Sequence, residues 1–178
     1  MATGREDRAR ATMESIAFVR PEITPRKQVP LRSLTAIYDR DRYLCRYCGR
    51  ATVCLPVLRM MSGLFPQQFP FHPNWKADSC HPAYSEISTS NDHVVPVSRG
   101  GDSLDETNIV TSCAGCNYRK SDLLLEHLGM TLQPIEHNSA WRGLADMYRP
   151  LWEAAGQPTL STNDKTWMRL TDALYRET

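Results

Sequence analysis

Four of the six cysteines form two Cys-x-x-Cys pairs, Cys45 with Cys48 and Cys113 with Cys116. Two thiolates three positions apart on a tight turn can face one ion, and two such turns supply the four sulfurs that zinc binds tetrahedrally in structural sites. The 64 residues between the pairs predict that a complete structural element separates the two halves of the site. The alternative is a redox-active pair, which would open a helix after a strand in a βαβ unit. That pattern is missing, so the spacing favours a structural zinc.

Cys54 and Cys80 lie outside these pairs, and Cys80 is followed directly by His81. A second metal site built from Cys54, Cys80, His72 or His81 is one interpretation. We favour the other, in which both thiols are buried in the segment between the pairs, because a free cysteine packs as a small apolar residue.

The elements that must position this chemistry are short. "STSNDHVVPVS" is rich in β-branched residues and predicts a strand that ends in a turn at "RGGD". "ETNIVTSC" predicts a second strand, and "AGCNYRKSDLLLEHLGM" predicts a helix that breaks near Gly129. Upstream, "SLTAIYDRDRY" has Leu34, Ile37 and Tyr38 at helical spacing, with Ser33 as the predicted N-cap.

The stretch "CRYCG … NDHVVPVSRGGDSLDETNIVTSCAGCNYRKSD" resembles the HNH endonucleases, a branch of the ββα-metal nucleases. The likeness spans residues 33–125. It consists of Asp-His, the Gly-Gly turn, Asn-Ile-Val, Cys-x-x-Cys-Asn and the following lysine, all in the order of that family. The resemblance implies an α+β fold, in which a ββα-metal (HNH) nuclease core is pinned by the structural zinc on its four cysteines. A proline-rich insert and a small helical C-terminal extension complete the expected fold.

The resemblance also implies roles for the polar residues of the motif. His93 would be the general base that takes a proton from water, and an imidazole that titrates near neutrality suits that step. Asp92 and the amide oxygen of Asn117 would hold one divalent cation, Mg²⁺ or Mn²⁺, because such ions prefer oxygen ligands. That cation can bind the scissile phosphate and stabilise the leaving group.

Three further residues have expected supporting roles. Asn108 would brace the loop and orient His93 by hydrogen bonding, and Lys120 and Arg119 would contact backbone phosphates. Taken singly, each is as well explained as a turn residue or as part of a solvated helix face. Taken in this order between two cysteine pairs, they favour a nuclease site. The zinc would be remote from the chemistry and would hold the strands and the helix start in place.

Residues 49–91 are longer than the HNH pattern leads us to expect, so we interpret residues 54–86 as an insert. "PVLRMMSGLF" predicts a short helix, and the proline-rich stretch after it predicts a loop. "LFPQQFPFHPNWK" contains Phe65, Phe69, Phe71 and Trp75. These aromatic side chains could form a small satellite core, which we favour, or could stack on an unpaired or flipped nucleotide.

Positive charge is concentrated at the start of the chain, although the net charge is only +1. Residues 1–50 hold 11 Lys/Arg and 6 Asp/Glu, whereas residues 121–178 hold 5 and 8. Most of the early cations are arginines, which suit bidentate phosphate contacts; a solvated basic segment is the alternative. The acidic balance after residue 121 argues against that region as the main DNA-binding surface.

We expect three parts along the chain. Residues 1–29 should be a basic, flexible N-terminal segment whose prolines interrupt any helix. Residues 30–133 should be the zinc-stapled HNH nuclease domain. Residues 134–178 should be a helical C-terminal extension with two short helices, "WRGLADMYRPLWEAAG" and "STNDKTWMRLTDALYRE", that packs on the core or makes a dimer contact.

The sequence predicts a cytoplasmic protein without a membrane partner. No run of 18 apolar residues is present, and the charged start "MATGREDRAR" lacks the apolar region of a secretory signal. Cysteines stay reduced in that compartment.

The function that the sequence favours is a metal-dependent HNH endonuclease that hydrolyses phosphodiester bonds in DNA, in a restriction or phage-related setting. A non-catalytic zinc-containing nucleic-acid-binding module is the first alternative, and the same chemistry on RNA is the second. Because one site cuts one strand, a double-strand cut would need a homodimer or two successive events.

Overall fold

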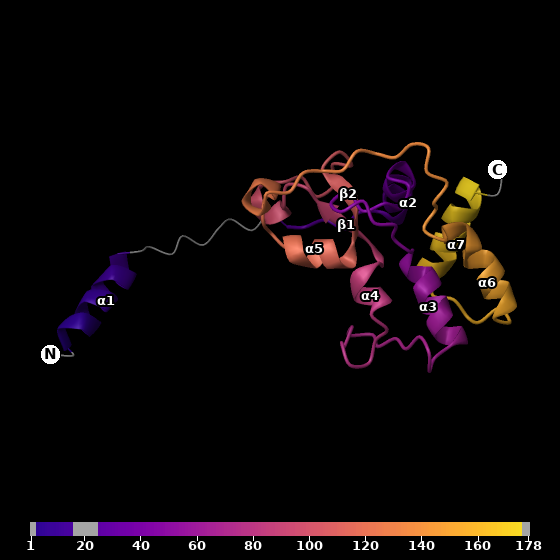
Figure 1. Cartoon of the computed structure of the whole chain (residues 1–178), viewed down its shortest axis with the longest axis horizontal. Coiled ribbons are helices and arrows are strands. Elements are labelled where there is room, and N and C mark those ends of the chain that lie inside the picture. The colour runs from indigo at the N-terminus through magenta and orange to yellow at the C-terminus, as the bar shows by residue number, and fades with distance from the viewer. Residues whose placement is uncertain (1–2, 16–24, 176–178) are drawn as a thin grey trace.

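The computed structural model describes residues 3–15 and 25–175. Among these residues, helices are combined with one antiparallel pair of strands, which confirms the α+β class (Figure 1). Strand β1 (Thr89–His93) pairs with strand β2 (Ile109–Cys113), and β2 leads directly into helix α5 (Ala114–Lys120). No helix in the described part is both long enough and apolar enough to cross a bilayer.

The hairpin separates two apolar clusters. His93 pairs with Ile109, and Asp92 pairs with Val110. Because successive side chains of a strand point to opposite faces, these two pairs face opposite ways. Ile109 belongs to the large core, and Val110 belongs to a small cluster that contains Cys45, Cys113 and Cys116. The sheet thus places Asp92 on the side of the cysteines and His93 on the side of the large core.

Strand β1 is shorter than the stretch "STSNDHVVPVS" predicts. It ends at His93, and a 3-10 turn η1 (Val97–Arg99) follows Pro96, which has no N–H to donate to a ladder. The turn closes at Gly100, whose φ of 91° is a left-handed conformation that glycine adopts without strain.

Helix α5 is also shorter than predicted. It stops at Lys120 because Ser121 adopts a φ of 50°, and a separate 3-10 turn η2 (Leu125–Leu128) follows. The predicted break at Gly129 is confirmed as the end of η2, where this glycine has a φ of 60°.

Helix α2 (Leu31–Arg40) is joined to the hairpin by a buried carboxylate. The predicted N-cap Ser33 is wrong: the helix begins two residues earlier, after Pro30, which makes no side-chain cap bond. At its other end Asp41, 1% exposed, accepts a 2.8 Å hydrogen bond from the backbone N–H of Thr111 in β2. Arg40 and Arg46 pair with the same carboxylate at 2.9 and 3.2 Å. These pairs compensate the burial of its charge.

The insert contains helix α3 (Leu55–Leu64), as predicted, and a single turn α4 (Ala83–Glu86). Between them the chain forms turns, and Phe69 and Phe71 stack on or tilt against His81 and Tyr84 with centroids 4.2 to 5.6 Å apart. Both phenylalanines pack against the large core. The packing interpretation of these two rings is therefore confirmed.

The C-terminal region contains the two predicted helices, α6 (Tyr148–Ala154) and α7 (Thr162–Tyr175), preceded by a 3-10 turn η3 (Ala145–Met147). Helix α7 packs against α2, and α6 packs against α3 (Figure 1). Tyr148 and Trp167 are buried in the large core together with Ile37 of α2. These helices therefore complete the core under the hairpin.

A helix, α1 (Thr3–Ser15), lies where the prolines predict none. The prediction is wrong here because the first proline is Pro21, which comes after the helix ends. Residues 4–12 are all exposed. Residues 16–24, on which part of the N-terminal prediction falls, lie outside the described residues.

Candidate active site and metal centre

The four paired cysteines meet in one cluster. The Sγ atoms of Cys45, Cys48, Cys113 and Cys116 all lie within 4.8 Å of one another. Three of the four are buried, and Cys48 is exposed. The donor set fits zinc, because four thiolate sulfurs brought together in this way are the ligands of a closed tetrahedral site.

Backbone bonds shape both halves of this cluster. Gly49, with a φ of 73°, donates to the carbonyl oxygen of Cys45 at 2.8 Å and closes the first turn. In the second half, the N–H of Cys116 donates to Sγ of Cys113 at 3.4 Å. The N–H of Arg46 donates to the carbonyl oxygen of Thr111 at 2.9 Å, which joins the first turn to β2. The cluster therefore ties the hairpin, the start of α5 and the segment after α2 together.

The other two cysteines are placed apart from it. Cys54 is fully buried in the large core, where burial raises the pKa of its thiol to about 12. Sγ of Cys80 accepts a hydrogen bond from the N–H of His72 at 3.1 Å within the insert. Within the described ranges, no second group of three or more His, Cys, Asp or Glu side chains is arranged to hold a metal.

Asp92 lies on the cysteine side of β1 and is 8% exposed. Its Oδ2 accepts a hydrogen bond from the hydroxyl of Tyr47 at 2.7 Å and lies 3.1 Å from the ammonium of Lys120. Burial, followed by the charge of Asp92, raises the pKa of Tyr47 well above its usual value. The tyrosine therefore stays protonated and acts as a donor.

Lys120 is located differently from what the sequence predicts. Its side chain is fully buried, and its Nζ donates to the carbonyl oxygen of His93 at 2.8 Å as well as pairing with Asp92. An ammonium without exposed surface cannot also reach a phosphate outside the fold, so the predicted phosphate contact of Lys120 is wrong for this conformation. Arg119, the neighbouring candidate, is exposed.

His93 is 3% exposed and lies on the opposite face of β1. Its Nε2 is 3.1 Å from the carbonyl oxygen of Ser103. A carbonyl oxygen only accepts, so this contact places a proton on Nε2 and leaves Nδ1 of a neutral ring as the acceptor. The sequence predicts that Asn108 orients the imidazole, whereas in the structure the ring contacts the carbonyl oxygen of Ser103.

Asn108 braces the loop between the strands. Its Oδ1 accepts from the N–H of Val95 at 2.8 Å, and its Nδ2 donates to the carbonyl oxygens of Val95 at 3.0 Å and Asp102 at 3.2 Å. Gly101 lies against this clamp, where a Cβ atom would be 2.0 Å from the carbonyl oxygen of Val95. The loop that carries Ser103 is therefore held close to the end of β1.

Asn117, on α5, reaches back to β1. Its Nδ2 donates to Oγ of Ser90 and to the carbonyl oxygen of Asn91, both at 3.1 Å. Because the amide nitrogen is occupied by these two bonds, Oδ1 is the atom of Asn117 that is suited to a cation.

Residues 78–133 match the family model of the HNH endonuclease. They form an HNH endonuclease domain. The match begins in the insert and includes both strands and α5, and it leaves out the first cysteine pair, α2 and the C-terminal helices. No curated protein and no solved structure matches the chain.

The HNH domain brings together most of the residues that the sequence singles out. Asp92 is part of β1, and Asn117 contacts the same strand from α5. Tyr47, the partner of Asp92, packs in the cluster that contains three of the four cysteines. Two residues of the HNH site are missing from the sequence prediction. Tyr47 could have been noticed because it stands between the two cysteines of the first Cys-x-x-Cys pair, whereas Ser103 acts through a backbone carbonyl, which every residue has.

Proposed function

We propose that this HNH domain hydrolyses phosphodiester bonds in DNA with the help of one divalent cation. The cation, Mg²⁺ or Mn²⁺, would neutralise charge on the phosphate and stabilise the leaving oxygen. Asp92 and Asn117 would hold it, because they supply a carboxylate and an amide oxygen next to one strand. Membership of the HNH family supports the reaction class, and the residue assignments are our inference from the geometry.

In this proposal His93 is the general base. The observation that carries the assignment is the 3.1 Å contact of Nε2 with the carbonyl oxygen of Ser103, since it leaves Nδ1 free to take a proton from water. The imidazole is 3% exposed, so substrate binding must expose its edge. Lys120 orients both sides of the site, because one ammonium is bonded to Asp92 and to the backbone of His93.

Of the two residues that the motif suggests for a phosphate contact, Lys120 and Arg119, only Arg119 is exposed. Its side chain is exposed on α5, one residue before Lys120 and two after Asn117. A guanidinium at that place can bind a phosphate of the DNA backbone in a bidentate manner.

Two observations favour a second candidate, a zinc-containing module that binds nucleic acid without cutting it. Asp92 is already paired with Lys120, and His93 is buried. Such a module would bind DNA with strong salt dependence and would never nick it.

The test is the nicking of supercoiled plasmid by purified protein with Mg²⁺, with Mn²⁺, and with no added divalent cation. The nuclease proposal predicts cleavage only with the cation, and a direct competition with RNA of the same sequence distinguishes DNA from RNA as substrate. Salt-sensitive binding without cleavage of either would leave the binding module as the function. Linear product formed directly from supercoiled plasmid, without a nicked intermediate, would indicate a homodimer.

A further inference from the structure

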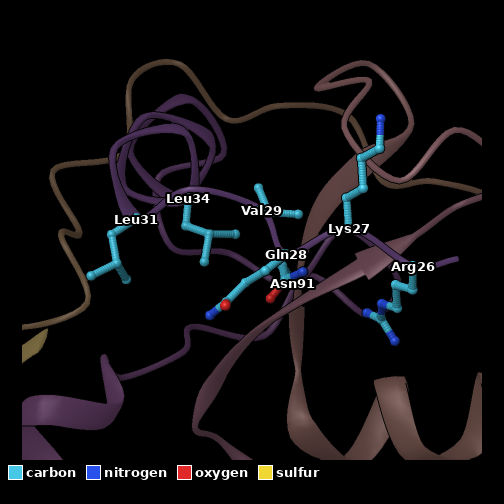
Figure 2. A pocket seen from close by; sticks show the side chains of 7 residues that line it. All are labelled: Arg26, Lys27, Gln28, Val29, Leu31, Leu34 and Asn91. Carbon is cyan, nitrogen blue, oxygen red and sulfur yellow. The ribbon is translucent and has the colours of Figure 1, made fainter.

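Two surface pockets meet on the strand that carries Asp92 and His93. One, with a volume of about 360 Å³, is lined by Arg26, Lys27, Gln28 and Val29 as well as Leu31, Leu34 and Asn91 (Figure 2). The other, of about 290 Å³, lies between Trp75, helix α2 and the start of α5. Both are lined by Leu34 and Asn91, so they form one groove along β1.

One end of the groove is positively charged. Arg26 and Lys27 are exposed, and neither makes an ion pair with another described residue. Figure 2 shows their side chains diverging at one side of the pocket, which Gln28 and Asn91 also line. Two unpaired cations beside two carboxamides suit the phosphates and the polar edges of a nucleotide chain.

The other end is aromatic. Trp75 is 39% exposed, unlike Phe69 and Phe71, which pack against the core. Its ring meets Tyr84 edge-on, with centroids 5.8 Å apart. It also lines the groove, together with Ser88, Thr89 and Ser90. An indole supported at its edge offers a rigid surface on which a base can stack.

The charged end and the shared middle of the groove are bonded to residues of the proposed site. The carbonyl oxygen of Asn91 accepts the 3.1 Å hydrogen bond from Asn117. The N–H of Lys27 donates to Oγ of Ser103 at 3.4 Å, and the carbonyl oxygen of Ser103 is the partner of His93. A strand held in the groove therefore lies against the elements that position both Asn117 and His93.

We propose that this groove binds an unpaired stretch of the DNA strand, with its phosphates at Arg26 and Lys27 and one base stacked on Trp75. The inference rests on the proposed function and deepens it. A base can stack on Trp75 only after it has left the stack of a duplex, so this binding mode requires an unpaired nucleotide. The enzyme would then act on single-stranded DNA or on a nucleotide flipped out of the duplex.

The test compares the binding of a labelled single-stranded oligonucleotide and of its duplex over a range of salt concentrations, without added divalent cation. We expect the single strand to bind at least tenfold more tightly. Trp75→Ala should weaken that binding roughly tenfold, and Trp75→Phe should retain most of it, because a base stacks on either ring. Arg26→Ala with Lys27→Ala should lower the slope of log affinity against log salt by about 1.4, or about 0.7 for each lost phosphate contact.

The matched control is Lys165→Ala with Arg169→Ala, which removes the same charge from exposed positions on α7. It should leave the preference for single strands unchanged. Equal affinity for duplex and single strand, or groove variants that bind like the wild type, would overturn the inference. If the wild type nicks plasmid and the groove variants bind normally, only the groove is wrong; if it neither nicks nor binds DNA, the proposed function itself fails.

Discussion

The hydroxyl of Tyr47 donates a 2.7 Å hydrogen bond to Oδ2 of Asp92, although 45 positions separate the two residues in sequence. Tyr47 stands between two cysteines of the metal cluster, and Asp92 is the proposed cation ligand. The cysteine cluster and the strand that carries the proposed cation ligand are thus joined by one buried side chain. The cysteine cluster is therefore not independent of the proposed site, because the turn that contains Cys45 and Cys48 also carries Tyr47, which positions the carboxylate of Asp92.

Tyr47→Phe should destabilise the protein by about 1–3 kcal/mol, because a buried hydrogen bond to a charged group is lost while the ring packing is kept. Plasmid nicking should fall as well, since Asp92 loses one of its two fixed partners. Tyr118→Phe is the matched control, because it makes the same substitution at a side chain that is 90% exposed. Urea unfolding measures the difference, and equal midpoints for the two variants would show that the contact contributes nothing.

Lys120→Met should be more severe, with a loss of about 3–5 kcal/mol, because it leaves a buried carboxylate without its charged partner. Arg119→Met changes the same charge at the exposed neighbouring position and should leave stability within about 0.5 kcal/mol. It should instead reduce the salt dependence of DNA binding. Denaturant unfolding and binding titrations of both variants separate the two roles. If the Lys120→Met protein is as stable as the wild type but binds DNA more weakly, Lys120 contacts a phosphate, as the sequence predicts, and does not stabilise the fold.

The metal cluster predicts one zinc ion for each chain. Cys48→Ser should abolish stoichiometric zinc and lower the melting temperature, because binding to a structural zinc site contributes directly to folding. Cys80→Ser, which changes a cysteine outside the cluster, should keep the full zinc content. Elemental analysis of the purified variants measures both, and a zinc content that survives Cys48→Ser would rule out the four-sulfur site.

Gly101→Ala should disrupt the loop that holds Ser103 against His93. Its Cβ would lie 2.0 Å from the carbonyl oxygen of Val95 and 2.8 Å from Nδ2 of Asn108, so the clamp must open. Gly63→Ala is the control: no atom lies within 4 Å of its Cβ position on α3, and we expect a gain of up to about 1 kcal/mol from helix propensity. Thermal unfolding of both proteins tests this contrast, which a stable and active Gly101→Ala variant would contradict.

The sequence predicts the hairpin, α5 and the cysteine cluster well because each has a local signal. β-Branched residues indicate the strands, and the Cys-x-x-Cys spacing indicates the turns. The ends of elements are less predictable. Helix α5 ends at Lys120, before Ser121 with its positive φ, and neither glycine nor proline stands there to indicate that end. Helix α2 begins after Pro30 without a side-chain cap.

The buried contacts of the site residues are only weakly indicated by the sequence. Lys120 follows a cysteine motif on a short helix, and only the packing of α5 on β1 shows that its ammonium points inward to Asp92. The partner of His93 is a carbonyl oxygen, which no residue type specifies. Likewise, helical periodicity predicts α6 and α7, but their packing on α3 and α2 depends on tertiary contacts that the pattern does not contain.

The most direct test of the proposed mechanism is the nicking of supercoiled plasmid by His93→Ala in the presence of Mg²⁺, beside wild type and His127→Ala. His127 is exposed on η2 and serves as the matched histidine control. We predict that His127→Ala cuts like the wild type. His93→Ala should lose at least about a hundredfold in rate, because a positioned general base contributes that much or more, while its zinc content and fold are retained. If His93→Ala cuts as fast as the wild type, His93 is not the base and the proposed mechanism is wrong.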